Sequence, residues 1–264
     1  MTATVMAASA AGAFGLVLAV WLASLALRDA SIIDVAWGAG FVAIGWICFA
    51  VGHGERDRRL LLALLVSAWG ARLATHIARR NLGRGEDRRY AAMRERDGGR
   101  FWLTSLYRVY VVQGIAMWVV SLPLQAGGAL GAGHGLGALD ALGAAVWLVG
   151  IGFEAIGDLQ LSRFVADPAN RGRVMDRGLW RYTRHPNYFG DATVWWGLGL
   201  VAAGAGAGAL WGFAGSILDT LLLTRVSGKP VLERDMEERR PGYRAYVERT
   251  SGFLPRPPRR AKRT

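Results

Sequence analysis

The chain reads Gly178-Leu-Trp-Arg-Tyr-Thr-Arg-His-Pro-Asn-Tyr-Phe-Gly-Asp191 immediately before an apolar stretch that begins at Ala192. The residue before a proline is disfavoured in a helix, so His185-Pro186 should end one element and begin the next. Asn187 and Asp191 would then lie four residues apart on one face of a helix. The stretch therefore predicts a polar site, with basic, amide and carboxylate side chains, at a membrane surface.

Apolar runs of similar length occur throughout the rest of the chain. Hydrophobic residues make up 52% of the 264 residues, and eleven residues are Trp. A helix needs about 17 to 25 mainly apolar residues to cross the hydrocarbon core of a bilayer. We therefore expect an all-α, polytopic membrane protein with about seven transmembrane helices, of which the last two must be short or tilted. The expected spans are Ala11 to Leu27, Ile32 to Gly52, Leu60 to Ala78, Leu106 to Gln125, Leu139 to Ile156, Ala192 to Leu210 and Trp211 to Leu223.

The 32 Lys and Arg residues are concentrated in particular loops. If the amino terminus is outside, 27 of them lie on the cytoplasmic side, as the positive-inside rule predicts. The net charge of +12 therefore indicates orientation in a membrane rather than binding of nucleic acid. Arg greatly outnumbers Lys, which together with abundant Ala and Gly suggests a GC-rich bacterial genome. We expect an integral protein of a bacterial inner membrane with its carboxyl terminus in the cytoplasm.

We expect residues 1–255 to form a single membrane-embedded domain. The final residues, Arg256 to Thr264, are basic, and we expect them to be disordered and attracted to anionic lipid head groups. Glycine-rich segments such as Gly150-Ile-Gly152 resemble part of a dinucleotide-binding fingerprint, but no strand precedes them. Close packing of membrane helices explains these glycines better.

Ionisable and amide groups inside the expected spans each require a partner or a function. Asp34, near the start of the second span, is either a protonated hydrogen-bond donor or a helix N-cap. Arg72 and His76 lie one turn apart and could pair with it across a helix contact. Gln113 either bridges helices or meets a substrate. Tyr107 is either an interfacial residue or a pocket hydroxyl.

A second pair of acidic residues, Glu154 and Asp158, repeats the four-residue spacing of Asn187 and Asp191. Two such helix faces would offer acceptors for ribose hydroxyls and a carboxamide. Both a bulky anionic cofactor and a solvated network of interfacial salt bridges fit these charges. The positive charge for phosphates would come from Arg163, Arg171, Arg173, Arg181 and Arg184.

Other chemistries have little support in the sequence. The four His residues are scattered and no Cys/His spacing of a metal site occurs, so we expect no metal. The single cysteine, Cys48, cannot form an intrachain disulfide. The chain contains no Gly-x-Ser-x-Gly element of a hydrolase and no phosphate-binding P-loop.

A set of short segments spread over most of the chain forms a recognisable pattern. Besides the run from Gly178 to Gly190, they are Asp34-Val-Ala-Trp-Gly38, Arg79-Arg-Asn-Leu-Gly-Arg-Gly-Glu-Asp87, Gln113-Gly114, Trp118-Val-Val-Ser-Leu-Pro123, Asp167-Pro-Ala-Asn-Arg-Gly172, Pro241-Gly-Tyr243 and Phe253-Leu-Pro255. With these segments the chain resembles the bacterial membrane branch of the steroid 5-alpha-reductase family. Its broad superfamily also holds isoprenylcysteine carboxyl methyltransferases.

The resemblance implies a helical bundle that binds NADPH largely on its cytoplasmic side, where loops and the tail form the cofactor site. The nicotinamide would reach into a lipid-accessible cavity. Asp34, with Tyr107 or Gln113, would polarise the substrate ketone. The residues expected to contact the cofactor are Glu154, Asp158, Arg163, Asn170, Arg171, Arg173, Arg181, Tyr182, Arg184, His185, Asn187, Tyr188, Asp191, Glu233 and Tyr246.

The implied activity is NADPH-dependent reduction of the carbon–carbon double bond of an apolar enone, such as a Δ4-3-oxo steroid, to the 5-alpha-dihydro product. The protein would then be an oxidoreductase of steroid or other lipid metabolism, with an apolar small molecule and membrane lipid as its partners. The alternative is an S-adenosylmethionine-dependent methyltransferase acting on a lipidated carboxylate, because that branch shares the Arg-His-Pro-Asn-Tyr type of segment and an acidic tail residue such as Glu233. A membrane scaffold or transporter is a third, non-enzymatic alternative.

Overall fold

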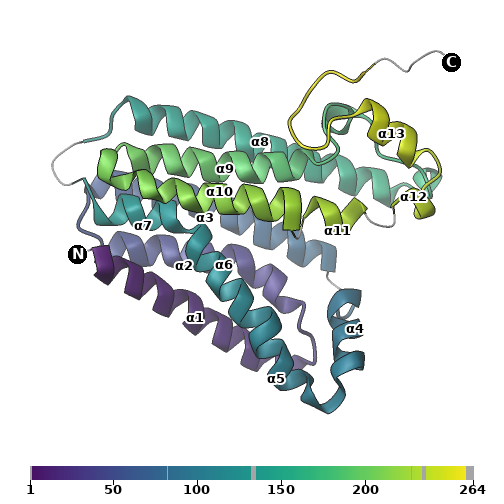
Figure 1. The fold of residues 1–264 in the computed structure, drawn as a ribbon, viewed down its shortest axis with the longest axis horizontal. Helices are drawn as coiled ribbons and strands as arrows, with labels where there is room; N and C mark the ends of the chain where they lie inside the picture. Colours follow the sequence, from purple (N-terminus) through teal and green to yellow (C-terminus); the bar gives the residue numbers. More distant parts are fainter. Residues whose placement is uncertain (1, 82, 132–134, 227, 234–235, 260–264) are drawn as a thin grey trace. The chain divides into compact units, whose positions relative to one another are not determined.

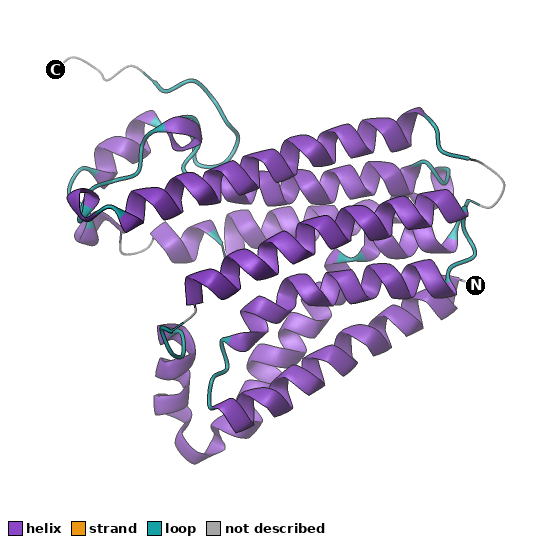
Figure 2. Cartoon of the chain, turned by 180° about the vertical axis from the view of Figure 1, so that it is seen from behind, coloured by secondary structure: helices purple, strands orange, loops and turns teal. Residues whose placement is uncertain are grey.

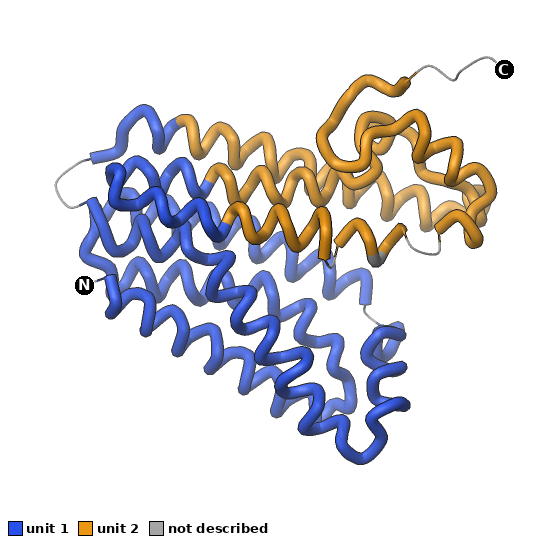
Figure 3. The backbone as a smooth tube through the Cα atoms, viewed as in Figure 1, with its two compact units in different colours: residues 1–141, 198–215 blue, residues 142–197, 216–264 orange. Residues whose placement is uncertain are grey.

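The computed structural model describes residues 2–81, 83–131, 135–226, 228–233 and 236–259, and this part of the chain contains helices and loops without a strand (Figure 1, Figure 2). The chain divides into two compact units (Figure 3). Unit 1 comprises residues 1–141 and 198–215, and unit 2 comprises residues 142–197 and 216–264. The prediction of an all-α, polytopic membrane protein is confirmed.

Unit 1 is built on three long helices, α1 (Thr2–Leu27), α2 (Ile32–Val51) and α3 (Arg56–Asn81). Helices α2 and α3 are antiparallel and pack most closely where Gly38 faces Gly70. A methyl group on either glycine would lie 2.4 or 2.5 Å from the carbonyl oxygen of the other, so only glycine allows this approach. The other elements of the unit are α4 (Arg88–Asp97), η1 (Gly98–Arg100), α5 (Phe101–Ser105), the π-helical η2 (Leu106–Val111), α6 (Val112–Val120), α7 (Leu122–Ala129) and η5 (Ala207–Gly212).

Unit 2 contains most of α8 (Ala138–Ala166), α9 (Pro186–Ala203) and α10 (Phe213–Leu221). A methyl group on Gly190 of α9 would lie 2.6 Å from the carbonyl oxygen of Gly150 and 2.4 Å from the amide nitrogen of Glu154, both on α8. The prediction of close helix packing is therefore confirmed for Gly150, whereas it is wrong for Gly152, where a methyl group would meet nothing within 4 Å. The other elements are η3 (Pro168–Asn170), η4 (Gly178–Arg181), the π-helical η6 (Leu222–Val226), α11 (Lys229–Glu233), α12 (Met236–Arg239) and α13 (Tyr243–Arg249).

Six helical segments of the described chain are long and apolar enough to cross a membrane. The expected span from Ala192 to Leu210 has no counterpart among them. It falls mainly on α9, whose first turns carry polar residues such as Asn187 and Asp191 and which ends at Ala203. The segment after it is longer than expected and does qualify. The six segments are Thr2–Leu27, Ile32–Val51, Arg56–Asn81, Arg88–Val120, Ala138–Ala166 and Ala207–Val226.

The carboxyl-terminal segment lies against the loop that precedes α9. A β-bridge pairs Thr183 with Ser251, and the Thr183 hydroxyl donates to the carbonyl oxygen of Phe253 at 2.7 Å. The Arg256 amide donates to the carbonyl oxygen of Tyr182 at 3.0 Å. The basic tail that we expected to be disordered therefore begins with residues held by backbone hydrogen bonds. Residues 260–264 of that tail lie outside the described residues.

Candidate functional site

In unit 1, a tyrosine hydroxyl lies between a carboxylate and an amide from two other helices. Tyr90 of α4 donates to Asp34 Oδ1 of α2 at 2.8 Å, and Gln113 Nε2 of α6 donates to the Tyr90 hydroxyl oxygen at 3.3 Å. Arg89 Nη2 donates to the other Asp34 oxygen at 2.8 Å. Asp34 therefore forms an ion pair with Arg89 and accepts the hydrogen bond of Tyr90.

Asp34 is also not the N-cap of its helix. Ser31 occupies the N-cap position of α2, and Asp34 lies in the first turn. A carboxylate there interacts favourably with the positive end of the helix dipole. The interpretation of Asp34 as an N-cap is therefore wrong, and its contacts with Tyr90 and Arg89 give it the position of a group that orients Tyr90.

Helix α4 is fixed to the turn between α1 and α2 by Glu86. Glu86 accepts hydrogen bonds from the Ala30 amide at 2.8 Å and from two nitrogens of Arg94 at 2.8 and 2.9 Å. The bond from Arg94 is the largest cause of a lowered pKa at Glu86, so this carboxylate stays ionised. Asp87 caps α4 by accepting from the Arg89 amide at 2.9 Å. These contacts hold Tyr90, which is 6% exposed, in the core of unit 1.

Tyr107, the tyrosine selected from the sequence, does not join this network. It lies on η2 with its side chain 47% exposed, and the Arg108 guanidinium lies 5.9 Å from its ring centroid. The structure brings Asp34 and Gln113 together through Tyr90, which the sequence analysis missed. The available signal was that Tyr90 is the one aromatic residue in the arginine-rich segment 79–100.

In unit 2, Glu233 of α11 binds the two residues that precede Pro186. Arg184 Nε and Nη2 donate to the two Glu233 oxygens at 2.8 and 3.2 Å, and His185 Nε2 lies 2.8 Å from Oε1. Arg184 Nη1 also donates to the carbonyl oxygen of Thr250 at 2.7 Å. The structure thus brings together three of the predicted cofactor residues, Arg184, His185 and Glu233. The Glu233 carboxylate neutralises the buried Arg184.

The two helix faces predicted from the four-residue spacing, one on α8 and one on α9, touch each other through one hydrogen bond. Asn187 Nδ2 of α9 donates to Asp158 Oδ1 of α8 at 3.1 Å. Glu154, one turn earlier on α8, is buried, and Asp191 is half-buried. The buried Asp219 of α10 adds a carboxyl group that interacts electrostatically with Glu154.

Four of the five arginines expected to hold phosphates are on the surface of unit 2. They lie at the end of α8 and in the loop that leads to α9, and they are Arg163, Arg171, Arg173 and Arg181. The fifth is Arg184, which Glu233 binds. Among the described residues, no group of three or more His, Cys, Asp or Glu is arranged to hold a metal ion.

Most of the remaining predicted cofactor residues contact the loop between α8 and α9, either from within it or from α13. Asn170 Nδ2 donates to the carbonyl oxygen of Phe164 at 3.1 Å. The Tyr188 ring stacks on the His185 ring with centroids 5.4 Å apart. The Tyr246 hydroxyl donates to the carbonyl oxygen of Trp180, whereas the side chain of Tyr182 is exposed.

The pairing of Glu233 predicts a pH dependence. Burial by itself would raise the pKa of Glu233, but the hydrogen bonds from His185 and Arg184 outweigh it and lower the pKa from 4.5 to about 2. A carboxyl group whose pKa is lowered by folding stabilises the fold above its unfolded pKa and loses this contribution as the pH falls through its folded pKa. We therefore expect Glu233→Gln to lower the thermal unfolding temperature near neutral pH. The difference from the natural protein should shrink between pH 4.5 and about 2. A difference that does not change over this range would contradict the assignment.

The fold and these contacts define a polytopic helical membrane protein with buried polar clusters in both of its units. The chain belongs to the family described as protein of unknown function DUF1295, which matches residues 20–250. An uncharacterized protein of Schizosaccharomyces pombe is 25% identical over 265 residues, a match that covers 89% of this chain and 75% of the yeast protein. No solved structure matches the chain.

Proposed function

We propose that this protein is an NADPH-dependent reductase that saturates the carbon–carbon double bond of an apolar enone, with a Δ4-3-oxo steroid as the substrate to test first. The observation that carries the proposal is the Tyr90 hydroxyl, held between Asp34 and Gln113 within the helices of unit 1. A hydrogen-bond donor fixed in an apolar surrounding is what a developing enolate oxygen requires. The resemblance of the sequence to the steroid 5-alpha-reductase family supports the same class of substrate.

In the proposed reaction, Tyr90 stabilises the charge that develops on the ketone oxygen. Its hydroxyl would turn from Asp34 to donate to that oxygen, while Gln113 keeps its bond to the phenol oxygen. Asp34 would remain paired with Arg89. NADPH, when bound, would supply the hydride that adds to the β-carbon, with NADP⁺ as the product. A proton from solvent then adds to the α-carbon, so one NADPH and one proton are consumed for each enone reduced.

The residues of unit 2 fit a dinucleotide in their chemistry. Exposed guanidinium groups suit phosphates, and buried carboxylates suit the hydroxyls of ribose. Arg184 is already paired with Glu233, so we assign it a positioning role for the loop rather than a phosphate contact. Where α8 and α9 meet, Asp158 would accept a hydrogen bond from the cofactor and Asn187 would donate one to it. With the amino terminus outside, as the basic loops predict, this loop would face the cytoplasm.

A ligand-binding measurement tests the proposal against its alternatives. We expect NADPH to raise the thermal unfolding temperature of the purified protein in detergent, because a ligand that binds only the folded state stabilises it by about 2.7 kcal/mol at 100 times its Kd. S-adenosylmethionine should give no shift. With progesterone or testosterone added, NADPH should be oxidised and the 5-alpha-dihydro product should form.

Each other outcome has a distinct meaning. A shift with S-adenosylmethionine alone would replace the reductase with the methyltransferase that acts on a lipidated carboxylate. A shift with neither ligand would favour a scaffold or transporter. Tight binding of NADPH without turnover of any enone would remove the reductase assignment and leave only a dinucleotide-binding protein.

A further inference from the structure

Lys229, the first residue of α11, brings a second positive charge to the buried Arg184 of unit 2. A methyl group on Gly252 would lie 2.6 Å from Lys229 Nζ and 3.2 Å from Arg184 Nη2, so the two cationic groups meet at this glycine. Gly252 directly follows Ser251, which pairs with Thr183 in the loop before α9. A larger residue at position 252 would therefore displace the Lys229 ammonium.

One carboxylate cannot neutralise both of these cations. Two nitrogens of Arg184 bind Glu233 at 2.8 and 3.2 Å, and His185 Nε2 lies 2.8 Å from the same carboxylate. The Tyr243 hydroxyl also interacts with Glu233 and with Arg184. Lys229 lies only four residues before Glu233 on α11, yet within the described part of the chain it forms no ion pair with a carboxylate. The two cations and the one carboxylate therefore leave an excess positive charge at this place.

The excess charge has the sign and the chemistry that a phosphate group requires. Because Glu233 already holds Arg184, Lys229 is the cation left for a ligand, and its side chain is half-buried. An ammonium offers a phosphate a compact charge and three hydrogen-bond donors. Partial shielding from water strengthens this attraction relative to that of a fully exposed lysine.

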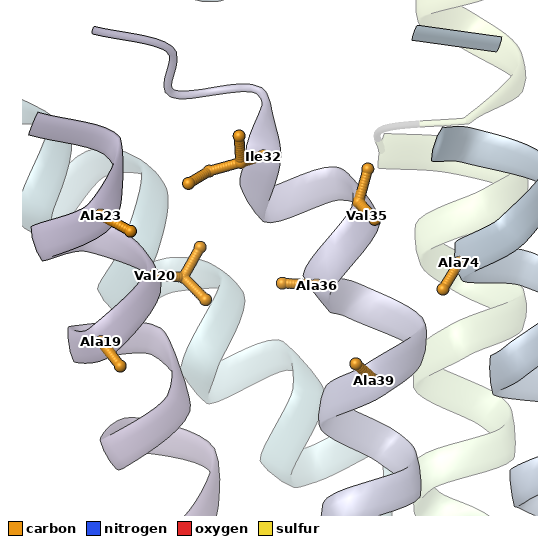
Figure 4. A pocket seen from close by; sticks show the side chains of 8 residues that line it. All are labelled: Ala19, Val20, Ala23, Ile32, Val35, Ala36, Ala39 and Ala74. Atoms are coloured by element: carbon orange, nitrogen blue, oxygen red, sulfur yellow. The ribbon is translucent and has the colours of Figure 1, made fainter. Parts of the chain in front are cut away.

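The apolar groove of unit 1 offers no such partner. It has a volume of about 500 Å³ between α1, α2 and α3, and all eight side chains that line it are hydrocarbon (Figure 4). A phosphate there would lose its hydration without gaining a hydrogen-bond partner. A phosphate-bearing ligand is therefore expected at Lys229 and not in this groove.

We propose that Lys229 binds a phosphate group of the dinucleotide, while Arg184 stays paired with Glu233. The choice of ligand rests on the proposed function, whereas the excess charge does not. Lys229 is then a phosphate contact from the carboxyl-terminal segment, in addition to the exposed arginines of the loop before α9. Gly252 is required because only a residue without a side chain leaves room for the ammonium.

Lys229→Gln in the full-length protein in detergent tests this contact. Loss of a hydrogen bond to a charged group should raise the Kd of NADPH by about 10- to 100-fold. The Kd of the natural protein should also rise more steeply with salt than that of the variant, because dissolved ions screen an attraction that the variant lacks. A purely structural role of Lys229 would leave this salt dependence unchanged. The matched control is Arg244→Gln on α13, where the side chain is 83% exposed, and it should bind NADPH as the natural protein does.

Gly252→Ala tests the same place without removing a charge. The added methyl group would push the Lys229 ammonium away, so NADPH should bind more weakly, by a smaller factor than in Lys229→Gln. The backbone of Gly252 is outside the left-handed region, so alanine adds no strain of its own. In the double variant the alanine should add little, because the group that it displaces is already absent. Thermal unfolding shows whether each variant is folded, and the two single variants are independent tests if one is not.

Inorganic pyrophosphate separates the phosphate site from the proposed cofactor. It should raise the thermal unfolding temperature of the natural protein but not that of Lys229→Gln. Stabilisation by pyrophosphate without binding of NADPH would keep the phosphate site and remove the dinucleotide together with the reductase. Unchanged affinity and salt dependence for NADPH in Lys229→Gln would overturn the role of Lys229 and leave the reductase assignment intact. If only phosphatidylglycerol stabilises the natural protein and not the variant, the phosphate belongs to a lipid and the dinucleotide assignment of this site is wrong.

Discussion

Tyr90→Phe is expected to lower turnover of the enone by about 100- to 1,000-fold, the effect of removing one fixed donor to a developing oxyanion. The affinity for NADPH should be unchanged, because the Tyr90 hydroxyl bonds to Asp34 and Gln113, neither of which is proposed to contact the cofactor. The phenylalanine ring fills the same space in the core, so the fold should be retained. Turnover at saturating NADPH and the Kd of NADPH, measured on the same preparation, separate the two effects.

Three further variants make this result specific. Asp34→Asn should also lower turnover, because an amide no longer pairs with Arg89 and orients the hydroxyl less firmly. Asn187→Ala should weaken NADPH binding while turnover at saturating NADPH is kept. Tyr107→Phe compares the tyrosine selected from the sequence with the one in the network, and its exposed position predicts little change.

The opposite pattern would assign different roles. If Tyr90→Phe reduces thermal stability but leaves turnover intact, the network of Asp34, Tyr90 and Gln113 only joins helices. If Tyr107→Phe is the variant that loses turnover, the ketone is bound at η2 and the assignment from the sequence stands. Either result leaves the NADPH binding test unaffected, so the cofactor and the polarising residue can be judged separately.

The helices could be predicted from the sequence because each depends on a local pattern. Apolar runs of membrane-spanning length gave α1, α2 and α3, and His185-Pro186 correctly placed the start of α9. The spacing of Glu154 with Asp158 and of Asn187 with Asp191 predicted shared helix faces, and one contact between those faces is present. Local periodicity therefore sufficed where one helix or two adjacent helices determined the result.

Contacts between distant segments could not be obtained in this way. Tyr90 reaches Asp34 across 56 residues, and Arg184 reaches Glu233 across 49 residues. Each of these residues is ordinary in its local sequence, since a tyrosine in a polar helix and a glutamate in a charged tail are both expected at a surface. Their burial depends on where the tertiary fold places α4 and α11, which no local pattern encodes.

The same limit applies to Arg58, which is 1% exposed although its local sequence is strongly charged. Its Nε and Nη2 donate to the two Asp140 oxygens at 2.8 and 2.9 Å across 82 residues, and the Asp140 side chain is 3% exposed. Asp140 Oδ2 also accepts from the Gly137 amide at 2.8 Å, which caps the first turn of α8. This buried ion pair therefore fixes the start of α8 to the start of α3.

Breaking this pair should have the largest effect on stability of any single change that we describe. Arg58→Met or Asp140→Leu would leave the other charge buried without its partner, and each is expected to lower the free energy of unfolding by about 3 to 5 kcal/mol. Arg56→Ala, two residues away and exposed, should change it by no more than about 0.5 kcal/mol. Denaturant unfolding of the purified protein in detergent measures all three.

The double variant Arg58→Met with Asp140→Leu distinguishes the cost of an unpaired charge from the contribution of the pair itself. Replacing both charges with apolar groups leaves no buried charge, and such replacements are often neutral. We therefore expect the double variant to lose less stability than either single variant, with the lost cap of Gly137 as its main cost. A double variant that is less stable than both single variants would contradict this account, because it would mean that the pair stabilises the fold beyond the mutual neutralisation of its charges.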